Sequence, residues 1–280
     1  MLQRVFHRRQ TSAAQLLKEG CKLVKKKIIE ELVEPGGKVR LYVDSALSHG
    51  TSIEVSPDHA HYLLRVMRAK EGDYVGVFNG IDGEWRTRIS RFGKRDCELI
   101  CEKRIIKQEE VPDVWLAFAP IKKIPTDYVT QKATELGVCV LQPVITHRTI
   151  ARRVNIDRMR ANATEAAEQS GRLTVPEIRA PIDLPVMLSS WPRDRRLILC
   201  DEGGKAPPLA EALSSKKNYL EKWAILTGPE GGFDGEEREE ICSHPFALAV
   251  SLGPRIMRAD TAALAALSIW QALCGDWAGD

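Results

Sequence analysis

The sequence predicts an α/β protein with a small β-barrel followed by a larger domain built on a parallel sheet. A length of 280 residues corresponds to about two domains, taking roughly 150 residues for each. Residues 39–106 carry several short, partly alternating apolar segments, the pattern of β-strands. After Pro112, continuous apolar segments alternate with helical patterns, which implies a parallel sheet covered on both faces.

The first 38 residues differ from the rest. A lysine-rich helical pattern in them ends at the breaker Pro35-Gly36-Gly37. The arginine-rich start is faintly similar to an organellar transit peptide, but a disordered extension or an over-called start codon is favoured. Residues 1–38 are therefore set apart as an N-terminal extension whose status is open.

Residues 39–106 form the predicted barrel domain. The sequence "NGIDGE" at 79–84 is a hairpin signal between two strands. Residues 56–73 read as a helix, with Ser56 as its N-cap and Pro57 at its first position. A polar segment, 106–113, serves as the linker. The expected strands are 39–43, 74–78, 84–92 and 96–105.

Residues 112–280 form the predicted α/β domain. Its helical patterns carry an apolar stripe with the helical period, and the last one is apolar nearly all round, which indicates burial against the sheet or a second subunit. The expected strands are 113–120, 138–145, 196–200, 223–227 and 246–252. The expected helices are 124–137, 155–171, a short one before 215, 234–242 and 261–275.

Composition excludes several classes of protein. Hydrophobic residues at 44% and charged residues at 28% are typical of a soluble globular chain. A net charge of +3 does not by itself indicate that the protein binds nucleic acid. Seven scattered cysteines without a CxxC pair suggest reduced thiols in a cytoplasmic protein. No metal site is expected, because neither Cys97 with Cys101 nor His59 with His61 has a matching ligand pair. No membrane segment is expected, because Ser268 interrupts the most apolar late stretch.

Three unusual loops follow predicted parallel strands: "LILCDEGG" at 197–204, "LTGPEGGF" at 226–233 and "LAVSLGPRIMRADTA" at 248–262. Ligands bind at the carboxyl ends of such strands. Each loop alone has a plain structural explanation, and Asp234 with Glu237 makes a reasonable capping pair. "GPEGG" is not a dinucleotide or triphosphate motif. Glycines instead let backbone groups contact a flat heterocycle such as adenine.

Basic residues gather in several segments. A solvated helix face explains some of them, but clusters in different segments fit a phosphate-backbone footprint better. They are Arg65 and Arg68, Lys122 and Lys123, and Arg148, Arg152, Arg153, Arg158 and Arg160.

Five motifs in order, "HYLLRVMRAKEGD", "QKATELGV", "ATEAAEQSGR", "LTGPEGGF" and "LGPRIMRADTA", resemble the ribosomal RNA small subunit methyltransferase E family of the SPOUT superfamily. The resemblance covers roughly residues 40–277. It implies a PUA-like barrel that helps to bind RNA and a SPOUT α/β domain with a deep trefoil knot. It also implies S-adenosylmethionine as methyl donor, a homodimer, and N3-methylation of a uridine in 16S ribosomal RNA of the small subunit.

The resemblance also implies site residues. Asp260 and Met257 stand where the family often has Glu and Leu, and Arg40, rather than the arginine of "RVF" at 4–6, is taken as the family's opening arginine. The implied cofactor-binding residues are Leu199, Thr227, Gly228, Pro229, Glu230, Gly231, Gly232, Leu252, Gly253, Ile256, Met257, Arg258, Thr261 and Ala262. The implied RNA-binding residues are Arg40, Arg65, Arg68, Lys122, Lys132, Gln169 and Arg172.

For catalysis, no histidine lies in the three loops, so the hypothesis is electrostatic stabilisation by Arg258 or Arg172. Glu230 is expected to shape the loop or face the cofactor rather than act as a base. Three alternatives stay open: a SPOUT enzyme that methylates a ribose 2′-hydroxyl or a guanine, a non-catalytic RNA-binding ribosome-assembly factor, and a nucleotide-binding oxidoreductase. The loop pattern disfavours the last.

Overall fold

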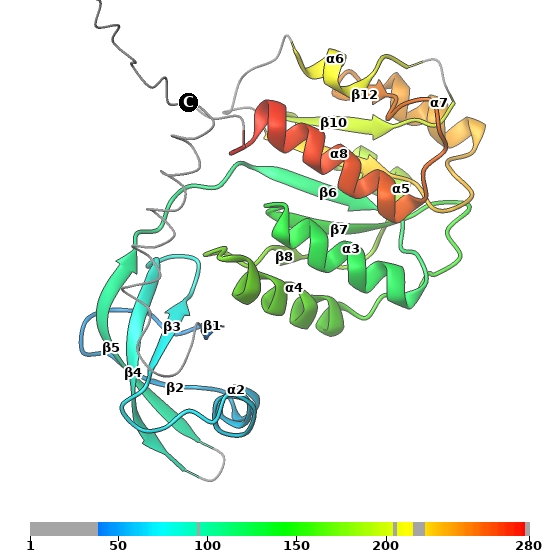
Figure 1. Cartoon of the computed structure of the whole chain (residues 1–280). Helices are drawn as coiled ribbons and strands as arrows, with labels where there is room; N and C mark the ends of the chain where they lie inside the picture. Colours follow the sequence, from blue (N-terminus) through cyan, green and yellow to red (C-terminus); the bar gives the residue numbers. More distant parts are fainter. Residues whose placement is uncertain (1–38, 94–95, 204–205, 215–221, 278–280) are drawn as a thin grey trace, which may run out of the picture. The chain divides into compact units, whose positions relative to one another are not determined.

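The computed structural model describes residues 39–93, 96–203, 206–214 and 222–277 (Figure 1). The helix expected within residues 1–38 lies outside the described residues. The chain divides into two compact units. Unit 1 runs up to Phe78 and resumes over Glu84–Ile106, and unit 2 comprises Asn79–Gly83 and the chain from Lys107. None of the described helices is long and apolar enough to cross a membrane.

Unit 1 is built on a five-stranded sheet in the order β1-β3-β4-β5-β2. β1 pairs with β3 in parallel, and the other neighbours are antiparallel. The hairpin predicted at 79–84 is confirmed, since β3 and β4 pair across it. β-bulges interrupt the β4–β5 ladder, which bends these long strands. The strands are β1 (Arg40–Tyr42), β2 (Ser52–Glu54), β3 (Tyr74–Phe78), β4 (Glu84–Phe92) and β5 (Cys97–Ile106).

The helix predicted at 56–73 starts as expected but ends early. Ser56 Oγ accepts the backbone N–H of His59, and Pro57 opens α2 (Pro57–His61). The chain then widens into a π turn, η1 (Tyr62–Val66), in which Met67 N bonds to Tyr62 O. Arg68 follows with a φ of 54°, a left-handed conformation that no α-helix continues through. The predicted helical extent to residue 73 is therefore wrong.

Unit 2 is built on a seven-stranded parallel sheet in the order β12-β10-β11-β6-β7-β8, with β9 also paired to β7. Its strands are β6 (Val114–Phe118), β7 (Val140–Ile145), β8 (Glu177–Ile178), β9 (Ile182–Asp183), β10 (Arg195–Cys200), β11 (Lys222–Thr227) and β12 (Ala247–Val250). Its helices are α3 (Lys123–Glu135), α4 (Ile156–Ser170), α5 (Leu184–Ser189), α6 (Leu209–Ser214), α7 (Gly235–Ser243) and α8 (Ala259–Cys274).

Alternate residues of these strands enter two separate cores, so the α/β class with helices on both faces is confirmed. In β11, Trp223 and Ile225 join a core with α3, α4, α6 and α8, whereas Ala224 and Leu226 join a core with α5 and α7. Figure 1 shows α3, α4 and α8 on one face of the sheet. The short elements β2, β8, β9 and α5 were not predicted, because so few residues show no period.

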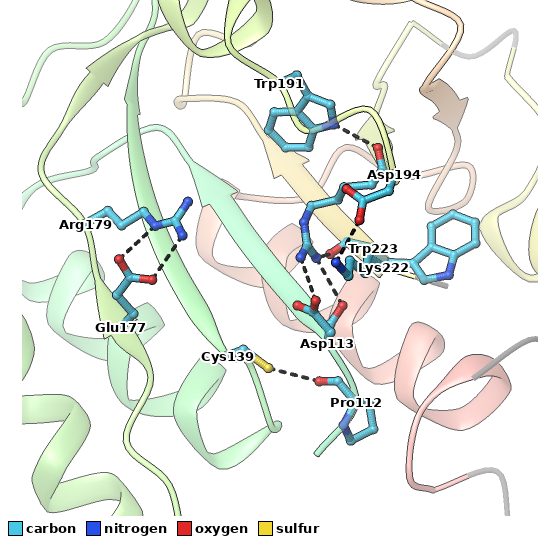
Figure 2. Close-up of polar contacts among 10 residues, drawn as sticks. Pro112, Asp113, Cys139, Glu177, Arg179, Trp191, Asp194, Lys222 and Trp223 are labelled. Carbon is cyan, nitrogen blue, oxygen red and sulfur yellow. Dashed lines mark hydrogen bonds and ion pairs between the residues drawn. The ribbon is translucent and has the colours of Figure 1, made fainter. Parts of the chain in front are cut away.

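Hydrogen bonds and ion pairs tie together the amino ends of the unit 2 strands (Figure 2). Arg195, 4% exposed, donates to Asp113 Oδ2 over 2.7 Å and to Trp223 O over 2.8 Å. Cys139 Sγ donates to Pro112 O over 3.1 Å. These contacts hold the amino ends of β6, β7, β10 and β11 together.

Candidate functional site

The three loops singled out in the sequence line one cavity of about 760 Å³. They follow β10, β11 and β12, which are neighbours in the sheet and parallel, so their carboxyl ends lie together. A concave site of this size at the carboxyl edge is typical of small-molecule binding in α/β proteins. The lining residues are Cys200–Gly203, Ala206, Pro208, Thr227–Glu230, Gly232, Phe233, Arg238, Ser251–Ala259 and Ala262.

Asp201 in the loop after β10 is a buried and fully engaged carboxylate. Its side chain is 6% exposed. Oδ1 accepts the N–H of Gly203 over 3.0 Å, and Oδ2 accepts Nη2 of Arg238 over 2.7 Å. Gly203 lies directly against this pair: a Cβ there would lie 2.7 Å from Arg238 Nη1 and would displace the guanidinium. This ion pair therefore joins α7 to the loop after β10 at the cavity wall.

Two glycines of "GPEGGF", Gly228 and Gly232, have structural reasons within the chain itself. A Cβ on Gly228 would lie 3.0 Å from the Phe233 ring. Gly232 has a φ of 65°, and a Cβ on it would meet Glu202 Oε1. Gly228 therefore packs closely against the Phe233 ring and Gly232 adopts a left-handed backbone, whereas a Cβ on Gly231 would make only ordinary contacts.

The loop after β12 places an exposed cation at the cavity. Arg258 is the N-terminal flanking residue of α8, its side chain is 77% exposed, and its Nε lies 3.8 Å from Asp260 Oδ1. Ile256 is 85% exposed although it is apolar. Gly253 has a φ of 118°, which favours glycine. The loop combines a positive charge with an open apolar surface.

Most of the implied cofactor residues meet at this cavity. Leu199 is fully buried beneath it, and neither Gly231 nor the exposed Thr261 lines it. Sequence reasoning selected neither Phe233, which lies in the loop after β11, nor Arg238 of α7; a helix residue such as Arg238 carries no signal that it reaches a loop after another strand. The predicted residues that do line the cavity are Thr227, Gly228, Pro229, Glu230, Gly232, Leu252, Gly253, Ile256, Met257, Arg258 and Ala262.

Arg172 is not brought to the cavity within the chain. Its guanidinium donates to Thr134 O over 2.8 Å and to Val138 O over 2.6 Å, just before the amino end of β7. Burial lowers the pKa of Arg172 to about 10. Because the cavity lies at the carboxyl edge, Arg172 and Arg258 occupy opposite edges of the sheet.

The implied RNA-binding residues fall into two groups. Arg40 is 12% exposed and forms a 2.8 Å ion pair with the buried Glu84. Lys132 and Gln169 contact carboxylates on their own helices, over 2.7 Å and 3.2 Å. The exposed residues are Arg65, Arg68 and Lys122.

One group of described residues has metal-ligand types within reach of one another: His147, Asp234 and Glu237. Its polar atoms already serve the start of α7, where Asp234 and Glu237 form the predicted capping box. A 2.5 Å contact joins His147 Nδ1 to Asp234 Oδ2. The hydrogen bond raises the pKa of His147, and bonds from Glu237 N and from His147 lower the pKa of Asp234. The capping of α7 therefore explains why Asp234 and Glu237 lie close together beside His147.

Known proteins resemble both units. Residues 107–271 match the family model for the RNA methyltransferase domain, and residues 55–100 match the model for the RNA methyltransferase PUA domain. The ribosomal RNA small subunit methyltransferase E of Rickettsia conorii is 34% identical over 82% of this chain and 93% of its own. The protein of that name from Synechocystis is 31% identical over 79% and 73%.

A solved structure also matches. The ribosomal RNA small subunit methyltransferase E of Neisseria gonorrhoeae, bound to S-adenosyl methionine, superposes with a TM-score of 0.78 at 28% identity. The match covers 86% of this chain and 100% of that chain. The PUA-type domain and the SPOUT-type α/β domain expected from the sequence are confirmed, and the trefoil knot stays a prediction.

Proposed function

Because the chain belongs to the RNA methyltransferase family whose domain spans residues 107–271, we propose that it is an S-adenosylmethionine-dependent methyltransferase of small-subunit ribosomal RNA. One observation carries the proposal: the three loops after β10, β11 and β12 line a single cavity. The relatives from Rickettsia conorii and Neisseria gonorrhoeae are named for this activity, and the second was crystallised with the cofactor.

The residues of the cavity fit this cofactor. S-adenosylmethionine supplies, when bound, an electrophilic methyl group on a positively charged sulfur. The lining carries both carboxylates, Glu202 and Glu230, and a guanidinium, Arg255, and S-adenosylmethionine likewise carries cationic groups and a carboxylate. Leu252, Met257 and Ala262 provide an apolar side for a flat heterocycle.

The finer proposal is methylation of N3 of a uridine in 16S ribosomal RNA. The methyl–sulfur bond breaks as the methyl–N3 bond forms, and the N3 proton leaves to solvent. None of the described residues that line the cavity is a histidine. A cation that stabilises the uracil anion serves instead. Of the two arginines implied for catalysis, only Arg258 lines the cavity, so we assign this role to Arg258 rather than Arg172.

RNA contact is assigned to exposed cations in each unit, with Arg65 and Arg68 in unit 1 and Lys122 in unit 2. Arg40, Lys132, Gln169 and Arg172 already have intramolecular partners, so they are weaker candidates. Backbone phosphates are bound by such exposed guanidinium and ammonium groups.

A homodimer and a cytoplasmic location complete the proposal. The α8 sequence "ADTAALAALSIWQALC" has no charged side chain after Asp260. Leu264 and Ala265 on this helix are only half-buried, and such an apolar surface suits a second copy of the chain. Light scattering after gel filtration tests the dimer, and a monomeric mass at micromolar concentration would exclude it. We propose the cytoplasm as the location because the proposed substrate is ribosomal RNA.

The test of the proposed function is methyl transfer from labelled S-adenosylmethionine to small-subunit particles, followed by nucleoside analysis. Label in 3-methyluridine supports the proposal. Label in a 2′-O-methylated nucleoside or methylguanosine supports a SPOUT enzyme with another target. RNA binding without transfer supports the assembly factor. Free 16S ribosomal RNA assayed in parallel distinguishes RNA from the assembled subunit as substrate.

A further inference from the structure

Residues 146–149, between β7 and α4, form a fixed turn beside the cavity. Thr146 N donates to Thr149 Oγ1 over 2.9 Å, and the two hydroxyl oxygens are 2.8 Å apart. Thr149 N also donates to Thr146 O over 3.1 Å. Both threonines are buried, with 3% and 4% exposure. The turn therefore has one closed shape, because its polar groups satisfy one another.

The buried carboxylate of Glu237 joins this turn to helix α7. Oε1 of Glu237 accepts the backbone N–H of His147 over 2.8 Å, and Oε2 accepts the backbone N–H of Asp234 over 3.1 Å. Glu237 is 3% exposed. Two backbone N–H groups on different segments, both partly buried, thus depend on one side chain, and its loss would leave both without this acceptor.

Arg148 joins the same turn to the cavity wall. Its Nη1 donates to Gly231 O over 2.7 Å. Its aliphatic stem lies against Gly231, where a Cβ would be 3.4 Å from Arg148 Cδ. Glu230 and Gly232 on either side of Gly231 line the cavity, whereas none of residues 146–149 does. The turn therefore contacts the wall from outside.

We propose that residues 146–149 and Glu237 form a positioning element that holds the "GPEGGF" loop in the shape that binds the cofactor. The inference rests on the proposed function, because it concerns the same cavity. Arg148 and Glu237 act through Gly231 and the start of α7. A merely structural role would change unfolding but not the cofactor affinity of the folded protein.

The experiment measures S-adenosylmethionine binding by calorimetry in the full-length protein. Arg148→Met keeps the stem and removes the bond to Gly231, and Glu237→Gln keeps the shape and removes one acceptor. Each change is expected to raise Kd by about tenfold, the upper range for one hydrogen bond. Arg160→Met and Glu240→Gln are the matched controls, since both residues are exposed on α4 and α7, and they are expected to keep the wild-type Kd.

A second measurement does not need the cofactor. Amide hydrogen exchange over residues 226–233 of the cofactor-free protein is expected to be faster in Arg148→Met than in Arg160→Met. Folded Arg148→Met with wild-type Kd and wild-type exchange would overturn the inference. Wild-type protein that does not bind S-adenosylmethionine would overturn the proposed function instead, and the exchange result would still decide the inference.

Discussion

Replacing Gly232 with alanine tests the account of the "GPEGGF" loop. Gly232 has a φ of 65°, and an alanine there would carry a Cβ against Glu202 Oε1. Glu202 is exposed, so its carboxylate can rotate away, and the main cost is the left-handed backbone. For a residue with a Cβ this conformation costs about 1–2 kcal/mol. Because Glu202 and Gly232 both line the cavity, the displaced carboxylate also changes the site.

The assay combines thermal unfolding with calorimetric titration of S-adenosylmethionine. Gly232→Ala is expected to lower the Tm by about 2–8 °C, taking roughly 2–4 °C for each kcal/mol. The Kd is expected to rise about tenfold, which corresponds to about 1.4 kcal/mol. Gly235→Ala is the matched control, because a Cβ there meets nothing within 4 Å. Gly232→Ala with the Tm and Kd of the wild type would refute the reasoning.

Three further predictions concern other residues. Arg172→Met is expected to cost about 3 kcal/mol in urea unfolding, because Thr134 O and Val138 O lose a buried donor; a cost no larger than that of Arg160→Met would contradict this. The hydrogen bond with Asp234 raises the pKa of His147, and the bond from Glu237 N, followed by the bond from His147, lowers the pKa of Asp234. The stabilisation by the His147–Asp234 contact is therefore lost as pH rises through the raised value above 6.5 and as pH falls through the lowered value below 3.8. The Tm difference between wild type and His147→Ala is therefore expected to be largest between these limits, and a pH-independent difference would contradict it. Replacing both Arg65 and Arg68 with alanine is expected to reduce the slope of log RNA affinity against log salt by about 1.4, at about 0.7 for each phosphate contact, without changing the Kd for S-adenosylmethionine; an unchanged slope would place the RNA elsewhere.

The sequence predicted three loops at the carboxyl ends of parallel strands, and such ends lie at one edge of a sheet. Gly228, Met257 and Arg258 were implied by the family resemblance, and all three line the cavity. Asp201 was noted in its loop, yet nothing local showed that it pairs with Arg238 on α7, because that contact spans 37 residues.

The sequence predictions that differ from the structure differ for local physical reasons. The π turn at Tyr62–Val66 and the left-handed Arg68 have no sequence signal, since the residues involved are ordinary helix formers. Arg172 was implied at the catalytic site by the family resemblance, whereas within this chain it bonds the carbonyls of Thr134 and Val138, a contact that charge alone does not reveal. The glycines were attributed to a ligand, and the structure adds reasons within the chain for two of them: the Phe233 ring beside Gly228 and the left-handed backbone of Gly232.

The most direct test of the central claim is single-turnover methyl transfer to small-subunit particles by wild type and by Arg258→Ala, at saturating S-adenosylmethionine. The account predicts a rate about 100-fold lower in the variant, as for the loss of one electrostatic contact to a developing anion, with Kd for the cofactor within about twofold. Arg258 is exposed, so folding is expected to be unaffected. Near-normal turnover by Arg258→Ala with intact cofactor binding would contradict the assignment of the catalytic charge to this cavity.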